Sequence, residues 1–353
     1  MGLLTEQPAE AASSALGQRQ PFRLGGATVR PGTRATVEIP VPRLLNRAEL
    51  AMSVKVVHGA KPGPVLLLSA ALHGDEVNGV EIILRLLNRI SARKLSGTVL
   101  AIPVVNVYGF ITNSRYLPDR RDLNRSFPGS SSGSLASRLA QLFTDEILSH
   151  ATHVVDVHTG GLHRSNLPQI RACLDDPRNV QLADAFGAPV VIDAKLREGS
   201  LRAAAVKRQM PMIVYETGEA LRLDRTGVLV GVRGILGVMH CLGMIQKAPA
   251  PPSAASFRST GSSWLRAPAS GLFRSDCRLG QLVRAGQSLG VINDPLGDDK
   301  VPVLAPCDGI VIGRTNIPLV HQGDPLAHIA YADGPQPPAI VMSVLRVELE
   351  DLR

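Results

Sequence analysis

Two apolar runs that each end in a histidine and a glycine constrain the fold of this chain most strongly. The first run, Val65 to Ala71, leads into Leu72-His73-Gly74-Asp75-Glu76, and the second, His153 to Val157, leads into His158-Thr159-Gly160-Gly161. Such runs are typical of strands that helices cover on both faces of a sheet. Polar side chains that emerge where these strands end lie at the sheet edge where α/β proteins place their sites. The two runs therefore predict a functional site at that edge.

The rest of the first 246 residues alternates between strand and helix patterns. Apolar residues with helical spacing run from Val77 to Ile90 and from Leu135 to Leu148. Alternating or apolar runs typical of strands surround them. This pattern predicts an α/β fold with a mixed, mostly parallel sheet flanked by helices. The strand runs are Arg34 to Ile39, Met52 to Val57, Thr98 to Val105, Pro189 to Ile192 and Met212 to Glu216.

The last hundred residues differ in texture and contain an internal repeat. Ala267 to Gly271 recurs as Ala305 to Gly309, and Leu282 to Leu289 recurs as Leu319 to Leu326, in a region of short apolar runs and glycine turns. Two similar halves predict a small, all-β domain, a duplicated sandwich or barrel. We therefore expect a flexible tail at 1–20, a catalytic domain at 21–246, a Pro/Ala/Ser-rich linker at 247–260 and the β-rich domain at 261–353.

Composition excludes several classes of function. The chain has 353 residues, a net charge of +8 and 3% aromatic residues, with neither a helix-turn-helix pattern nor a dense basic run. We read the charge as a field that favours an anionic small molecule, with no nucleic acid as partner. No apolar stretch reaches the ~18 residues of a membrane span, and four cysteines lack any C-x-x-C spacing. We expect a cytoplasmic protein that does not bind membranes, and we leave homo-oligomer formation open.

The residues at the two strand ends predict a metal site. His73 and Glu76 offer an imidazole nitrogen and a carboxylate oxygen from one turn, and His158 emerges from the other strand. Three such ligands complete a catalytic zinc site with one position open for water. His163 is an alternative to His158, and Asp75 is a candidate for orienting a ligand imidazole. Cobalt or manganese could replace zinc with these ligands.

Two further groups of polar residues could complete a hydrolytic site. Glu216 ends an apolar run and could act as the general base for a metal-activated water, with Glu219 as the nearest alternative. The long segment from Asn106 to Ser134 is rich in loop-forming residues and carries four arginines. A guanidinium can grip a carboxylate or stabilise an oxyanion. The arginines are Arg115, Arg120, Arg121 and Arg125.

Four motifs stand in order along the chain: His73 to Glu76, Asp122 to Gly129, Asp156 to Gly160 and Glu216 to Gly218. Together they resemble the succinylglutamate desuccinylase/aspartoacylase family, which has a zinc carboxypeptidase-like fold. The β-rich tail resembles the barrel-sandwich fold of biotinyl and lipoyl domains. The whole layout is similar to family members that deacetylate N-acetyl-diaminobutyrate.

The resemblance implies a role for each of the site residues. It implies one zinc ion per chain, held by the two histidines and the glutamate named above, and Glu216 as the base that activates water. It implies that Asn124 and Arg125 hold the substrate carboxylate and that Arg115 polarises the scissile carbonyl, with Arg120 and Arg121 as alternatives for this last role. We therefore expect a zinc-dependent amidohydrolase that removes a small acyl group from an N-acylated amino acid. The alternatives are a zinc carboxypeptidase that acts on short peptides and a non-catalytic binding module.

Overall fold

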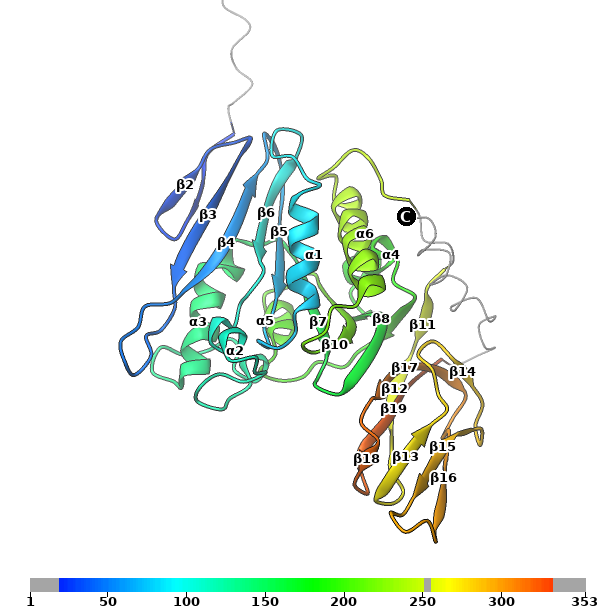
Figure 1. Ribbon diagram of the computed structural model, residues 1–353. Coiled ribbons are helices and arrows are strands. Elements are labelled where there is room, and N and C mark those ends of the chain that lie inside the picture. Colours follow the sequence, from blue (N-terminus) through cyan, green and yellow to red (C-terminus); the bar gives the residue numbers. More distant parts are fainter. Residues whose placement is uncertain (1–18, 251–254, 333–353) are drawn as a thin grey trace, which may run out of the picture.

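The computed structural model describes residues 19–250 and 255–332 of the chain. A large mixed sheet of thirteen strands runs through both parts of the molecule, and a four-stranded sheet packs against one end of it (Figure 1). The strand order is β12-β19-β17-β8-β10-β7-β5-β6-β4-β3, with β9, β11 and β14 paired off this path. The fold class predicted from the sequence, α/β with a small all-β domain, is confirmed.

The centre of the large sheet is parallel and its flanks are antiparallel. Strands β6, β5, β7 and β10 run in the same direction, so their carboxyl ends meet at one edge. Strand β8 runs against β10, and β4 runs against β6. The strands of this part are β3 (Thr33–Pro40), β4 (Ala51–His58), β5 (Lys61–Ala70), β6 (Ser96–Ile102), β7 (His153–Gly160), β8 (Arg164–Ala172), β9 (Val190–Asp193) and β10 (Met212–Glu219), preceded by the hairpin of β1 (Phe22–Leu24) and β2 (Ala27–Val29).

Helices cover both faces of the sheet, and the alternation of β5 shows how. Leu66 and Leu68 of β5 join a core with α1, α4 and α6, whereas Leu67 between them joins a second core with α2, α3 and α5. A fully apolar strand is therefore needed, because both of its faces are buried. The helices are α1 (Asn78–Leu87), α2 (Val107–Ile111), α3 (Leu135–Glu146), α4 (Pro177–Phe186), α5 (Leu201–Lys207) and α6 (Arg225–Cys241), with short turns η1 (Leu123–Arg125) and η2 (Leu148–His150).

The C-terminal part is a sandwich of two sheets around one apolar core. Phe273, Ile292 and Val303 from the four-stranded sheet pack against residues of the large sheet such as Val311 and Ile329. The repeat in the sequence thus corresponds to strands on both layers. These strands are β12 (Gly261–Arg266), β13 (Gly271–Ser275), β14 (Leu282–Val283), β15 (Ser288–Asn293), β16 (Lys300–Leu304), β17 (Gly309–Thr315), β18 (Leu319–Val320) and β19 (Pro325–Tyr331).

Main-chain pairing joins the two parts. Strand β17 pairs antiparallel with the first residues of β8, from Arg164 to Asn166, and β11 (Phe257–Ser259) pairs parallel with β9. Strand β11 falls within the range 247–260 that the sequence predicts as a linker. Residues 1–18 of the predicted tail, 251–254 of the predicted linker and 333–353 of the predicted β-rich domain lie outside the described residues. The domain boundaries remain predictions.

Candidate metal centre and active site

The turn after β5 places His73 and Glu76 at the edge of the sheet. Strand β5 ends at Ala70, and the next residue, Ala71, adopts a φ of +45° that turns the chain out of the strand. Gly74 lies so close to α2 that a Cβ atom there would come within 2.0 Å of the carbonyl carbon of Gly109. The glycine of this motif is therefore required by the close approach of α2 to the turn.

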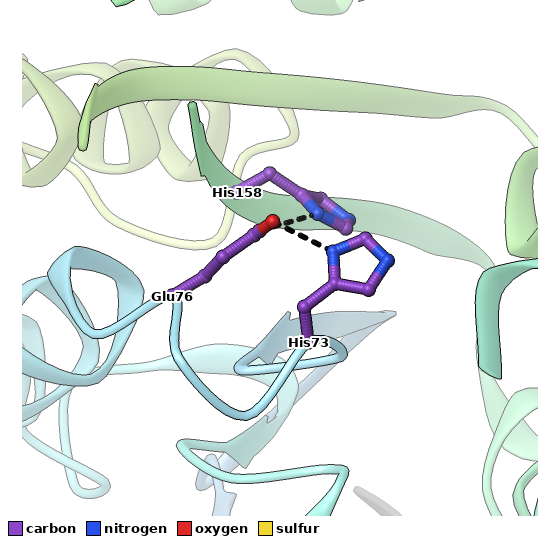
Figure 2. Close-up of side chains that lie close together, drawn as sticks. All are labelled: His73, Glu76 and His158. Carbon is purple, nitrogen blue, oxygen red and sulfur yellow. Dashed lines mark hydrogen bonds and ion pairs between the residues drawn. The ribbon is translucent and has the colours of Figure 1, made fainter. Parts of the chain in front are cut away.

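Strand β7 brings His158 to the same place. It pairs in parallel with β5, and His158 lies near the point where β7 ends, beyond the last residue of β5 in the register. Figure 2 shows the two imidazoles and the carboxylate of Glu76 converging. Nδ1 of His73 lies 2.7 Å from Oε1 of Glu76, and Nδ1 of His158 lies 2.8 Å from Oε2. The three ligand atoms lie within 4.8 Å of one another, and all three residues are buried.

Two aspartates fix the outer nitrogens of the imidazoles. Oδ2 of Asp156 lies 2.7 Å from Nε2 of His158, and its other oxygen accepts a hydrogen bond of 2.6 Å from Ser69. Oδ1 of Asp122 lies 3.1 Å from Nε2 of His73. Each carboxylate favours a proton on Nε2 and so leaves the Nδ1 lone pair for a cation. Two nitrogens and one carboxylate oxygen, all pre-oriented, match the ligand set of a catalytic zinc ion.

The carboxylates of Glu76 and Asp122 are held in their charged form. Burial alone raises the pKa of the Glu76 carboxyl, but the adjacent imidazoles of His73 and His158 outweigh burial and hold this pKa well below its usual range. At Asp122, burial also raises the pKa of the carboxyl, but the hydrogen bond with His73 and the nearby charge of Arg115 lower it by more. The carboxylate of Glu76 therefore remains charged and available as an anionic ligand for a metal cation.

Glu216 lies beside the triad, on the next strand. It is opposite His158 in the parallel register of β10 and β7. Its Oε2 accepts a hydrogen bond of 2.8 Å from Nδ2 of Asn166, and its Oε1 lies 3.6 Å from Nε of Arg171. Its side chain is 20% exposed, against 2% for Glu76. Glu216 can therefore meet water and substrate while its two oxygens stay oriented.

The alternative base, Glu219, has different partners. Its Oε2 accepts hydrogen bonds of 2.7 Å from Asn316 and 3.4 Å from Ser165. It lines a cavity of about 610 Å³ to which both parts of the molecule contribute, including Phe273 and Arg314 of the C-terminal part. This arrangement makes Glu219 a residue of the boundary between the two parts.

The loop from Asn106 to Ser134 delivers one arginine directly to the triad. Nη1 of Arg115 lies 3.3 Å from Oε1 of Glu76, and its Nη2 donates a hydrogen bond of 2.9 Å to Asp122. The two alternatives, Arg120 and Arg121, are exposed, and in the described part of the chain no side-chain interaction connects them to the triad.

The predicted carboxylate-binding residues lie on the η1 turn of the same loop. Oδ1 of Asn124 accepts a hydrogen bond of 2.9 Å from the main chain of Leu201, which begins α5. Arg125 is exposed and donates to the carbonyl oxygen of Asn124. The Asn124 side chain is thus fixed through one atom, while its Nδ2 has no hydrogen-bond partner within residues 19–250 and 255–332. The structure places both residues one turn from Asp122, but their role in binding remains a prediction.

Sequence reasoning missed several residues that hold the site. Asp75 is the residue expected to orient a ligand imidazole, yet its Oδ1 has no hydrogen-bond partner in the described part of the chain. The imidazoles contact Asp156 and Asp122 instead. Asp156 could have been found from its spacing, because residues two apart on a strand share a face. No local signal marks Asn166 as a partner of Glu216.

The comparisons with known proteins identify the class of this protein. The family model described as the succinylglutamate desuccinylase/aspartoacylase catalytic domain matches residues 62–242. That range contains the candidate metal ligands, the loop arginines and Glu216. The chain belongs to the succinylglutamate desuccinylase/aspartoacylase family.

Individual relatives align with most of the length of this chain. The N-alpha-acetyl-L-2,4-diaminobutyric acid deacetylase of Halomonas elongata is 30% identical over 281 residues, which cover 76% of this chain and 82% of the relative. A crystal structure of a succinylglutamate desuccinylase/aspartoacylase from Rhodobacter sphaeroides matches with a TM-score of 0.76 and 28% identity, covering 85% of this chain and 96% of that chain. The product-bound ectoine utilization protein EutE (DoeB) from Ruegeria pomeroyi has the same fold, with a TM-score of 0.76 and 24% identity over 85% of this chain and 95% of that chain.

Proposed function

We propose that this protein is a zinc-dependent amidohydrolase that removes a small acyl group from an N-acylated amino acid. The observation that carries the proposal is the convergence of His73, Glu76 and His158 at a sheet edge, with Glu216 on the adjacent strand. The kinship with a diaminobutyric acid deacetylase supports an amide bond as the target. A zinc ion held by the triad would supply the Lewis acidity that activates a water molecule and polarises the acyl carbonyl.

The chain's own residues account for the rest of the reaction. Glu216 takes a proton from the attacking water as the new C–O bond forms, and returns it to the nitrogen as the C–N bond breaks. Arg115 lies where its guanidinium can stabilise the charge that develops on the carbonyl oxygen. Asn124 and Arg125 hold the amino-acid carboxylate, so that the amide is oriented before attack. The products are a free carboxylic acid and a free amine.

The test is a panel of substrates with zinc-loaded protein. The panel contains N-acetyl-diaminobutyrate, N-acetylaspartate, N-succinylglutamate, their α-carboxamides, and short peptides with free C-termini. Acid release from N-acyl amino acids supports the deacylase. Slower release from the α-carboxamides supports binding of the substrate carboxylate by Asn124 and Arg125. Cleavage of the peptides instead would make the protein a carboxypeptidase, and silence with zinc bound would support a binding module.

Substitution of the base separates chemistry from metal binding. Glu216→Gln removes the proton acceptor, so kcat falls by about 10²–10⁴-fold, while the zinc content measured by atomic absorption stays at the wild-type value. Glu219→Gln is the matched control, because Glu219 is a nearby carboxylate on the same strand with partners in the C-terminal part. Wild-type turnover in Glu216→Gln would show that another group is the base.

The cytoplasm remains our proposed location. All four cysteines are free thiols in the structure, as a reducing compartment would have them. No helix in the described part of the chain is long and apolar enough to cross a membrane.

A further inference from the structure

The two residues that orient Glu216 both come from β8. Asn166 donates to one oxygen of its carboxylate, and the Nε of Arg171 lies 3.6 Å from the other. Strand β8 lies between β10, which carries Glu216, and β17 of the C-terminal part. Asn166 and Arg171 are therefore on the strand that pairs with the C-terminal domain.

Arg171 is held from the other side by a buried histidine of β19. Its Nη2 lies 3.4 Å from Nδ1 of His328, which is 4% exposed. The imidazole of His328 stacks on the indole of Trp264, with ring centroids 4.6 Å apart and 11° between the planes. Trp264 lies opposite His328 in the pairing of β12 with β19. The ring that meets Arg171 is thus fixed in position by a flat aromatic neighbour.

Burial, followed by the charge of Arg171, lowers the pKa of His328 to about 3. The imidazole is therefore neutral at neutral pH, and its Nδ1 can accept a hydrogen bond from Arg171. Arg164, whose guanidinium lies 5.9 Å from the Trp264 ring centroid, is the other cation next to the stack.

Gly313 of β17 brings Asn166, the other residue that orients Glu216, into contact with the C-terminal domain. It is opposite Asn166 on one side and opposite His328 on the other. A Cβ atom at this position would come within 3.0 Å of Oδ1 of Asn166 and 3.2 Å of Cβ of His328. The close approach of β17 to Asn166 therefore depends on the lack of a side chain at Gly313.

We propose that His328 and Gly313 are positioning residues for hydrolysis: the C-terminal domain holds Arg171 and Asn166, and these two hold the carboxylate of Glu216. The inference rests on the proposed role of Glu216 as the base. A proton acceptor displaced by ~1 Å can cost ~10²-fold in rate, so such a second layer of contacts has a kinetic effect without touching substrate. The C-terminal domain would thus contribute to hydrolysis by keeping the base in position.

The first test removes the acceptor on His328. His328→Leu lowers kcat by about 10- to 100-fold and leaves KM within about twofold, because substrate contacts are unchanged. His328→Asn keeps an acceptor atom near the position of Nδ1 and restores most of the loss. His321→Leu, at an exposed position of the same domain, is the control and behaves as wild type. A proportional rise of KM, or equal losses in the Leu and Asn variants, would overturn the proposal.

A double-mutant cycle tests the path through Arg171. If His328 acts through this guanidinium, His328→Leu costs no further activity in an Arg171→Met background. Additive losses would show that His328 does not act through Arg171 and would overturn the proposal. Gly313→Ala is a second variant: it adds one methyl group against Asn166 and lowers kcat with zinc still bound, and unchanged kcat would count against the proposal.

The metal-free protein gives a readout that does not depend on turnover. Trp264 is the only tryptophan of the chain, so its emission reports on the stacked imidazole. Protonated imidazole quenches indole. Burial keeps the pKa of His328 low in both proteins, but Arg171→Met removes the nearby cation, so its quenching step lies at a higher pH than that of the wild type. Identical curves would mean that Arg171 and His328 are not in contact in solution.

The outcomes separate this inference from the proposed function. Full activity in Glu216→Gln would show that Glu216 is not the base and would overturn the inference as well. An inactive Glu216→Gln together with wild-type kcat in His328→Leu would leave the proposed function standing and overturn only the role of the C-terminal domain.

Discussion

The proposed metal triad and the proposed base, Glu216, lie on neighbouring strands, yet their side chains are held by different parts of the molecule. The triad is buried, and its outer contacts, Asp156 and Asp122, belong to the catalytic domain. Glu216 is more exposed, and its partners sit on β8, which pairs with the C-terminal domain. Metal binding and proton transfer are therefore expected to respond to substitutions in different places. Three predictions test this separation, and a fourth tests the buried histidine on the side of the base.

The largest effect is expected at the centre of the triad. Glu76→Gln removes the charge that lies between the two imidazoles, and a neutral amide is a poor zinc ligand. We expect loss of bound zinc and of essentially all turnover, measured by atomic absorption and by acid release. Stoichiometric zinc in this variant would show that Glu76 is not a ligand.

Asp156→Asn tests the outer contact on the triad side. The imidazole of His158 loses the carboxylate that fixes its tautomer, so zinc affinity falls by about 10- to 100-fold. Competition with a chromogenic chelator measures this affinity. Asp75→Asn is the control, since Asp75 is a carboxylate of the same turn that makes no hydrogen bond to either imidazole within the described residues. An unchanged affinity in Asp156→Asn would contradict the assignment.

Asn166→Ala tests the matching contact on the base side. The variant loses one hydrogen bond to Glu216, an interaction with a charged group worth about 1.5–3 kcal/mol. We expect a fall in kcat of about tenfold or more and an unchanged zinc affinity. If zinc affinity fell along with kcat, metal binding and the positioning of Glu216 would not be independent.

The smallest effect concerns stability and pH. In the unfolded chain His328 takes up a proton near the ordinary histidine pKa of 6.5, whereas in the folded chain its pKa is about 3. The unfolded chain therefore binds more protons between these values. Stability from the neutral imidazole is complete above about pH 6.5 and is lost as the pH falls, by about 2 kcal/mol at pH 5.

Thermal unfolding at pH 7 and pH 5 measures this loss. The difference in melting temperature between the two pH values should be larger for the wild type than for His328→Asn, because asparagine does not titrate in this range. Equal differences would mean that His328 is already accessible to protons in the folded protein.

Much of the fold and the convergence of His73, Glu76 and His158 could be predicted from the sequence, because the signals are local. The apolar run before His73 predicts a buried strand, which is β5, and the spacing of His73 and Glu76 predicts a shared metal. The helix pattern from Leu135 corresponds to α3. Each of these inferences needs only periodicity and the rule that strand ends carry sites.

The contacts around Glu216 could not be predicted, because they depend on pairing between distant strands. Asn166 is 50 residues from Glu216, and Arg171 is 157 residues from His328. No pattern along the chain indicates that β8 turns back against β10 or that β17 pairs with β8. A one-residue shift in either register would point these side chains to the opposite face.

The continuous sheet also determines what would happen to a shortened chain. Leu167, Val190 and Ile192 of the catalytic domain share an apolar cluster with Ile310 and Ile312 of the C-terminal domain. Deletion of residues 261–332 would leave this patch in water beside the unpaired main-chain groups at the start of β8. An uncovered apolar strand edge recruits other chains. We therefore expect the C-terminal domain to prevent aggregation by covering this edge, and a truncated catalytic domain to precipitate.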